Sequence, residues 1–85
     1  MVKRNKLEII KDILKIIQDS HGLIKITPLI RKSNLSSQGF YQYLDGLIYK
    51  KLVLKTDGHI KLTQKGTNYL ERYSSIVGFI DEFGL

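Results

Sequence analysis

The chain of 85 residues has no cysteine, no tryptophan and only one proline. Without cysteine, neither a disulfide framework nor a thiolate metal site can form. No apolar run approaches the roughly 18 residues of a membrane span, and the Met-Val-Lys-Arg start leads into an amphipathic segment, unlike a signal peptide. We therefore expect a cytoplasmic protein without membrane contact. A hydrophobic fraction of 42% is enough for the core of one small domain.

The basic side chains are unevenly distributed along the chain, whose formal net charge is +6. Residues 1–65 contain thirteen Lys and Arg against five acids, a net of +8, whereas residues 66–85 contain one arginine against three acids, a net of −2. A basic body with a slightly acidic, apolar tail indicates polyanion binding in one part and protein contact in the other. A basic surface that only keeps the protein soluble is the alternative interpretation.

Apolar residues at helical spacing predict a first helix over residues 6–20. Asn5 is expected to cap this helix, with Glu8 in the capping-box position. Gly22 is expected to supply the left-handed residue that ends it.

A short strand and a short second helix are predicted next. The alternating, β-branched residues 24–26 fit a strand. Thr27 is then expected to cap a helix over residues 28–33, with Pro28 at its first position, where the missing N–H costs nothing.

A third helix is predicted after the polar turn of residues 33–36, with Ser36 or Ser37 as its cap. At 100° per residue, one side of this helix is apolar and the opposite side is polar. Gly39 and Gly46 either admit another backbone or weaken the helix. The side expected in the core carries Phe40, Leu44 and Leu47, and the far side carries Gln38, Gln42, Asp45 and Tyr49.

A β-hairpin is predicted after the third helix, and two registers are open. A two-residue turn at Asp57-Gly58 mixes apolar and polar side chains on each face. A three-residue loop over residues 56–58 instead sets Leu54 opposite Ile60, and we prefer it for that reason. The buried face then holds Leu52, Leu54, Ile60 and Leu62, and the wing exposes Lys55, His59 and Lys61.

A fourth helix, capped by Thr63 and running to about residue 82, carries a broad apolar stripe. Gly66 is expected at a close-packing position near its start. The stripe is wider than one contact surface needs, so one edge is predicted to pack on the body and the other to meet a second subunit. The predicted dimer interface consists of Tyr69, Tyr73, Ile76, Val77, Ile80 and Phe83.

Four segments in this order resemble the small archaeal winged helix-turn-helix DNA-binding proteins, which are transcriptional regulators or chromatin-associated proteins. The segments are Lys6-Leu7-Glu8-Ile9-Ile10, Asn34-Leu35-Ser36, Tyr43-Leu44 with Leu47, and Leu62-Thr63-Gln64-Lys65-Gly66. The resemblance implies a mainly α fold with a small β-hairpin wing (α+β), with a winged-helix DNA-binding domain over residues 1–63. It also implies a C-terminal dimerisation helix over residues 64–85, which joins two chains in antiparallel fashion.

The chain departs from this family pattern in three places. The glycine usual between the third helix and the first wing strand is Lys51 here. The segment before the third helix is slightly longer, and the fourth helix is shorter, ending by Leu85. The exposed residues of the third helix also differ, so no target sequence carries over.

In a helix-turn-helix, the N-terminal part of the second helix enters the major groove. The exposed face of the third helix has no Lys or Arg before Lys50, so it lacks the commonest base contact, arginine to guanine. We predict modest sequence discrimination, with affinity coming mainly from phosphates. The base-reading candidates are Ser37, Gln38, Tyr41 and Gln42. The phosphate candidates are Arg31, Lys32, Lys50, Lys55 and Lys61, with Lys3, Arg4 and Lys6 as further candidates and an ordinary solvated surface as the alternative for each.

The sequence therefore predicts a homodimeric transcriptional regulator that binds double-stranded DNA and is nucleoid-associated in the cytoplasm. His21 and His59 stand far apart without carboxylates at ligand spacing, so we expect no metal site, no cofactor and no enzyme activity. No small-molecule ligand is predicted. Two alternatives stay open: an architectural protein that coats DNA with little sequence preference, and a winged helix used for protein–protein contact.

Overall fold

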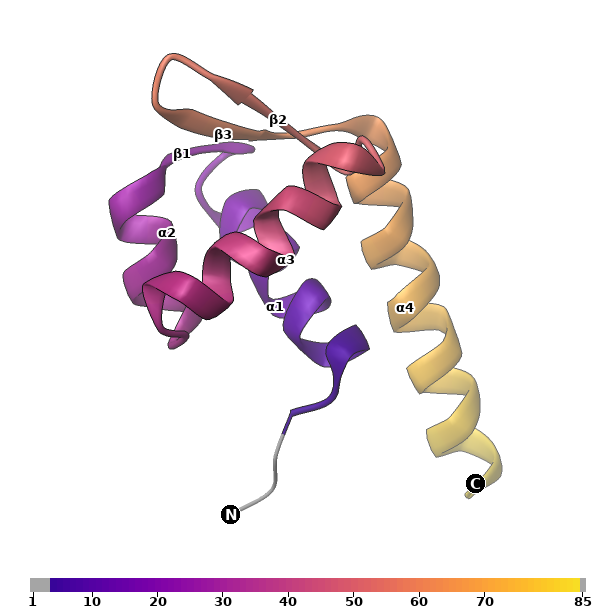
Figure 1. Cartoon of the computed structure of the whole chain (residues 1–85). Helices are drawn as coiled ribbons and strands as arrows, with labels where there is room; N and C mark the ends of the chain where they lie inside the picture. Colours follow the sequence, from indigo (N-terminus) through magenta and orange to yellow (C-terminus); the bar gives the residue numbers. More distant parts are fainter. Residues whose placement is uncertain (1–3, 85) are drawn as a thin grey trace.

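The computed structural model describes residues 4–84 and is mainly helical, with one small antiparallel sheet. Three helices lie against one face of the sheet, whose strand order is β1-β3-β2, and a fourth helix leads away from the body (Figure 1). None of the helices in the described range is long and apolar enough to cross a membrane. The elements are α1 (Lys6–Asp19), β1 (Leu23–Lys25), α2 (Ile26–Ser33), α3 (Ser37–Tyr49), β2 (Val53–Thr56), β3 (His59–Leu62) and α4 (Gln64–Phe83).

A single hydrophobic core joins the three packed helices and the first half of α4 to the inner face of the sheet. The predicted apolar side of each helix supplies it, because residues three and four apart point to the same side of a helix. The buried apolar residues are Ile10, Ile13, Leu14, Ile17, Ile24, Leu29, Phe40, Leu44, Leu47, Leu52, Val53, Ile60 and Leu70.

Three of the predicted helix caps are confirmed by side-chain hydrogen bonds. The Asn5 side chain accepts from the N–H of residue 8 at 2.8 Å, and Ser36 rather than Ser37 accepts from the N–H of residue 39 at 3.1 Å. Thr63 accepts from the Gly66 N–H at 3.0 Å. Each hydroxyl or amide satisfies one of the donors that a helix start leaves unpaired, so the local sequence determines where these helices begin.

The predicted start of α2 is wrong. The helix begins at Ile26, so Thr27 is not its cap and Pro28 is its third residue. The Ile26 N–H donates to the Gly58 carbonyl at 3.3 Å, so the hairpin takes over part of the role of a cap. Pro28 is still tolerated, because the first four N–H groups of a helix have no partner within it. The tip of the wing is thereby held against α2.

The preferred hairpin register is also wrong. Leu54 pairs with Lys61 and is 49% exposed, because the loop is the two-residue turn at Asp57-Gly58. Both turn residues have positive φ (46° and 76°), the conformation that suits the twist of a tight hairpin. Val53 fills the inner face in place of Leu54. The turn residues, and not the longest apolar alternation, determined the register.

Two backbone positions connect α3, the hairpin and α4. Lys51, which stands where the proteins that the sequence resembles usually have glycine, has φ 62°, a left-handed conformation that glycine adopts most easily. Gly66 is at a close-packing position, as predicted: a Cβ there would collide with the Leu52 carbonyl oxygen and come within 2.6 Å of Leu62 Cδ1. Gly46 differs, since a Cβ at that position would meet nothing within 4 Å among residues 4–84. Gly46 therefore does not serve to admit another backbone.

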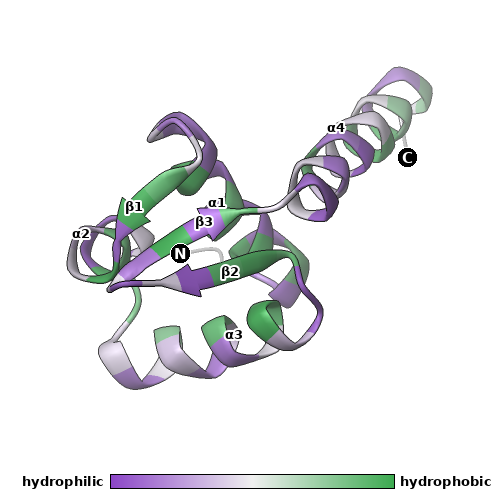
Figure 2. Cartoon of the chain, turned by 90° about the horizontal axis from the view of Figure 1, so that it is seen from above, coloured by the Kyte–Doolittle hydropathy of each residue, from purple (hydrophilic) through white to green (hydrophobic). Residues whose placement is uncertain are grey.

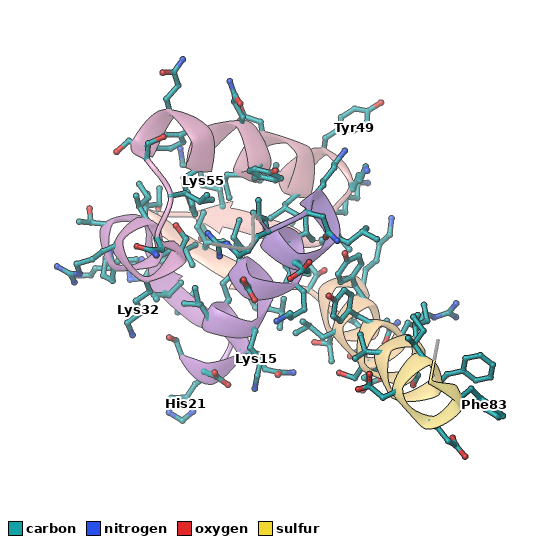
Figure 3. The ribbon with its side chains drawn as sticks, turned by 90° about the horizontal axis from the view of Figure 1, so that it is seen from below. Lys15, His21, Lys32, Tyr49, Lys55 and Phe83 are labelled. Atoms are coloured by element: carbon teal, nitrogen blue, oxygen red, sulfur yellow. The ribbon has the colours of Figure 1, made fainter. Side chains whose placement is uncertain are left out.

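The first half of α4 packs on α1, and its second half extends beyond the body. Leu70 is buried in the core, and Tyr73 is half-buried beside Lys11, whose Nζ is 5.8 Å from the ring centroid. Figures 1 and 2 show α4 directed away from α3 and from the sheet, with apolar residues recurring along its length. The end of the helix, at Phe83, points away from the rest of the molecule (Figure 3).

Candidate nucleic-acid interface

The polar side of α3 is open to solvent while its apolar side is in the core. Phe40 and Leu44, on the core side, are 0% and 1% exposed. Tyr41 is 42% exposed, although its ring also meets that of Phe40 edge-on at 5.7 Å. The four predicted base-reading residues, Ser37, Gln38, Tyr41 and Gln42, are all exposed. The structure thus brings them together on one accessible face, as the spacing predicted.

The turn between α2 and α3 is fixed by several polar contacts. Asn34 ends α2 in the left-handed conformation, with φ 62°. The buried Ser33 hydroxyl donates to the Ile30 carbonyl at 2.6 Å and accepts from the Leu35 N–H at 3.3 Å. Arg4 donates to the Ser33 carbonyl at 3.1 Å. These contacts set the angle at which α3 leaves the body.

The Arg4 guanidinium bonds to groups within the protein, so the N–H groups that make those bonds are not available to bind phosphate. Besides its bond to Ser33, its guanidinium pairs with Asp12 at 2.9 Å, and Lys11 pairs with the same carboxylate at 2.7 Å. Burial raises the pKa of Asp12, but hydrogen bonds from Lys11 and Arg4 outweigh it and leave the pKa below its usual value. The Lys11 pKa is raised, chiefly by the same hydrogen bond. Of the other N-terminal candidates, Lys6 is exposed and Lys3 lies outside the described residues.

The five predicted phosphate contacts are exposed and belong to none of the ion pairs found within residues 4–84. Arg31 and Lys32 are in the last turn of α2, and Lys50 directly follows α3. Lys32 extends to the side away from α3 (Figure 3), so it is poorly placed to share a ligand with that helix.

The corrected register separates the two lysines of the wing. Lys55 pairs with Ile60, so its side chain starts from the inner face of β2, the strand that contacts α3. Lys61 pairs with Leu54 and Leu23, on the outer face of the sheet. The predicted register would have put both lysines on one face. Cations are therefore available on both sides of the hairpin.

Sequence reasoning left out two exposed features near this face. Tyr49, the last residue of α3, is 86% exposed and projects away from the body (Figure 3). Lys25 pairs with His59, so it adds a cation to the outer face of the sheet. The sequence already places Tyr49 on the polar side of α3, although not among the base-reading candidates, whereas Lys25 depends on the pairing of β1 with β3.

The predicted dimer residues divide into two groups. Tyr69 and Tyr73 are half-buried against the body and stack at 6.4 Å. Ile76, Val77, Ile80 and Phe83 are between 38% and 60% exposed. Phe79, which was not in the predicted set, is equally exposed and lies 4.8 Å from the Phe83 ring. An apolar strip therefore covers the free half of α4.

Residues 3–79 match the sequence model of the winged helix-turn-helix family. This chain is a winged helix-turn-helix protein. An uncharacterized protein of the archaeon Methanocaldococcus jannaschii is 34% identical to it over 79 residues, which is 93% of the chain. The winged helix-turn-helix chain spans 36% of the length of that relative. Membership of this family indicates DNA binding.

Proposed function

We propose that the protein is a homodimeric transcriptional regulator that binds duplex DNA with α3 in the major groove. The observation that carries the proposal is the exposure of the polar side of α3 on a helix whose other side is locked in the core. A helix held in this way can present fixed side chains to base edges without paying a large ordering cost on binding. Residues 1–63 would form the DNA-binding part and residues 64–85 the dimerisation part.

Base reading is assigned to the first half of α3. Gln38 and Gln42 lie one helical turn apart on the same side, and a glutamine amide can bond both N6 and N7 of adenine. Ser37 and Tyr41 can donate to bases or phosphates. No Lys or Arg occurs within α3, and Asp45 shares its polar face, so we infer modest discrimination between sequences.

Phosphate binding is assigned to the five predicted cations, Arg31, Lys32, Lys50, Lys55 and Lys61. Each neutralised phosphate releases condensed counterions, so the affinity should fall steeply as salt is added. The two sides of the hairpin would then contact different stretches of backbone, with Lys55 on the α3 side and Lys61 on the outer side.

Dimerisation is assigned to the apolar strip of α4. Leaving Ile76, Phe79 and Phe83 in water is unfavourable, by about 25 cal/mol for each Å² of apolar surface. A second α4 packed against this strip in antiparallel fashion would cover it and would carry two copies of α3 toward one duplex. The proposed interface residues are Tyr69, Tyr73, Ile76, Val77, Ile80 and Phe83.

Fluorescence anisotropy with a labelled duplex at several salt concentrations tests the proposal. The logarithm of the affinity should fall by about 0.9 for each logarithmic unit of salt and each phosphate contacted, giving a slope of several units. A flat slope, or no duplex binding at low salt, would reject DNA binding and leave a protein-contact role for the winged helix.

In-vitro selection of duplexes separates a regulator from an architectural protein. The lack of Lys and Arg in α3 is the observation that favours the second candidate, because it weakens direct readout. A regulator should enrich one motif and bind it at least about 10³-fold more tightly than random duplex. Retention of DNA without enrichment would show an architectural protein instead.

A further inference from the structure

An apolar groove lies where α1, α3 and α4 meet. Its volume is about 700 Å³. Buried residues of the core, Leu47 and Leu52, form part of its floor, and Leu7, in the first turn of α1, lines it while remaining 57% exposed. Its exposed side chain adds to the apolar surface that a ligand could cover.

Three lysines from three different elements line the same groove. Lys6 comes from α1, Lys50 from the end of α3 and Lys65 from the first turn of α4. Its lining, within the described part of the chain, includes no Asp or Glu, and the three lysines take part in none of the ion pairs found there. Lys65 donates one hydrogen bond to the Lys50 carbonyl at 2.9 Å and keeps its other two donors. Apolar walls with cationic side chains suit a ligand that is apolar and negatively charged.

Tyrosines and a glycine give the groove its shape. Tyr43 and Tyr69 line it, and the Tyr69 hydroxyl donates to the Leu7 carbonyl at 3.3 Å, which ties α4 to the start of α1. Burial, together with the neighbouring Tyr73, raises the pKa of Tyr69 above its ordinary value. Gly46 leaves space in the α3 wall, because a Cβ there would meet nothing within 4 Å. The result is an open slot beside aromatic rings.

We propose that this groove binds a small amphipathic anion, a carboxylate with a flat aromatic or short aliphatic body. The body would lie on the leucine and tyrosine surface, and the carboxylate would meet the ammonium groups of Lys6, Lys50 and Lys65. Charge complementarity selects this occupant over a neutral lipid-like molecule or an apolar helix. The sequence predicts no small-molecule ligand because the three lysines are far apart along the chain and only the fold assembles them.

The test uses 2-naphthoate as the anionic probe and 2-naphthamide as its neutral partner of the same shape. Each is titrated into the ¹⁵N-labelled full chain without DNA, and the amide shifts of Gly46 and Lys50 are followed. We expect saturable shifts with naphthoate and at least about tenfold weaker binding of naphthamide, since a hydrogen bond to a charged group is involved. Lys50→Ala should weaken naphthoate several-fold and leave naphthamide unchanged.

Gly46→Leu fills the groove and provides the structural control. It should reduce naphthoate affinity at least about tenfold, because the new side chain occupies the ligand space. Gly78→Leu is the matched variant, another exposed helical glycine with nothing within 4 Å of a Cβ, and it should bind naphthoate as the wild type does.

Four results would overturn the proposal. Equal affinity for the two probes would show that the lysines do not select a charge. An unchanged affinity of Gly46→Leu, or shifts confined to the apolar strip of α4, would place the ligand elsewhere. Dissociation of a dimer by Gly46→Leu, with sedimentation as the readout, would show that a second copy fills the groove. None of these measurements includes DNA, so failure here is distinguishable from failure of the proposed function.

Discussion

Gly66→Ala should destabilise the protein, although the same change in an open helix position stabilises it. Gly66 is buried at the start of α4, directly against the backbone of Leu52. A Cβ at this position collides with the Leu52 carbonyl oxygen and comes within 2.6 Å of Leu62 Cδ1. Because one of the two obstacles is backbone, no change of side-chain rotamer removes the clash.

The size of this loss in stability follows from three contributions, one favourable and two unfavourable. Replacing a helical glycine by alanine favours folding by about 1 kcal/mol. Overpacking a closed site costs roughly 1–3 kcal/mol. The Leu52 carbonyl also accepts from the Thr63 N–H at 3.2 Å, and moving it weakens this bond, worth about 1 kcal/mol. It shares the single Thr63 hydroxyl hydrogen, at 2.9 Å, with the nearer Lys51 carbonyl. We expect a net loss of about 1–3 kcal/mol, a fall in Tm of roughly 5–15 °C for a domain of this size.

Urea unfolding followed by circular dichroism measures this loss, and Gly46→Ala is the control. Gly46 is exposed within α3 and a Cβ there meets nothing within 4 Å, so this variant should gain about 1 kcal/mol. Protein concentration must be the same for all samples, because the stability of a dimer depends on it. If Gly66→Ala is as stable as the wild type, the close approach of α4 to the hairpin is wrong. If both variants shift equally, helix propensity alone explains the effect.

Three further predictions address function and stability. Gln42→Ala should change the DNA sequence preference more than the slope of log affinity against log salt. Lys61→Ala should lower that slope by about one and leave the sequence preference unchanged. Equal effects of each variant on both quantities would contradict the assignment of base reading to α3 and of phosphate binding to the wing. Ile80→Asp should convert a dimer into a monomer in sedimentation velocity, and an unchanged species would remove α4 from the interface. The pKa of Asp12 is lower in the folded than in the unfolded protein. The Asp12 carboxylate therefore stabilises the fold fully above its unfolded pKa, about 4, and this stabilisation is lost as the pH falls through the lower folded pKa. Urea unfolding at neutral and acidic pH should therefore show that the free energy of unfolding falls less on acidification for Asp12→Asn than for the wild type. Equal falls would exclude this carboxylate as a source of the pH dependence.

The features that could be predicted from the sequence depend on neighbours along the chain. Asn5, Ser36 and Thr63 each bond an N–H three residues ahead, so a cap and its partner are visible in one short segment. The apolar period of α3 likewise determined which side faces the core and left Gln38 and Gln42 exposed. The position of each residue along one helix was therefore sufficient to predict the proposed base-reading face.

The features that could not be predicted depend on contacts between distant segments. The start of α2 depends on the Gly58 carbonyl, which only the folded hairpin brings to Ile26. The register was mispredicted because burial of Leu52 was attributed to strand alternation. Leu52 precedes β2, and its N–H bonds to the Leu47 carbonyl at 2.9 Å, so the turn out of α3 positions it. The ion pair between Arg4 and Asp12 also cannot be predicted from the spacing of residues in the sequence.

The junction between the winged-helix body and α4 links the proposed reading of DNA to dimerisation. Thr63, Lys65 and Tyr69, all at the start of α4, bond to carbonyls of Lys51, Lys50 and Leu7 respectively, at 2.7, 2.9 and 3.3 Å. Two of these carbonyls directly follow α3, so a tilt of α4 must move the end of the proposed reading helix or break these bonds. The distance between the two reading helices of a dimer would then depend on a few hydrogen bonds, and the proposed anion groove lies among them. A ligand in that groove, which Gln42 and Lys50 also line, is therefore expected to change how the dimer spans its two half-sites and to compete with DNA for these two residues.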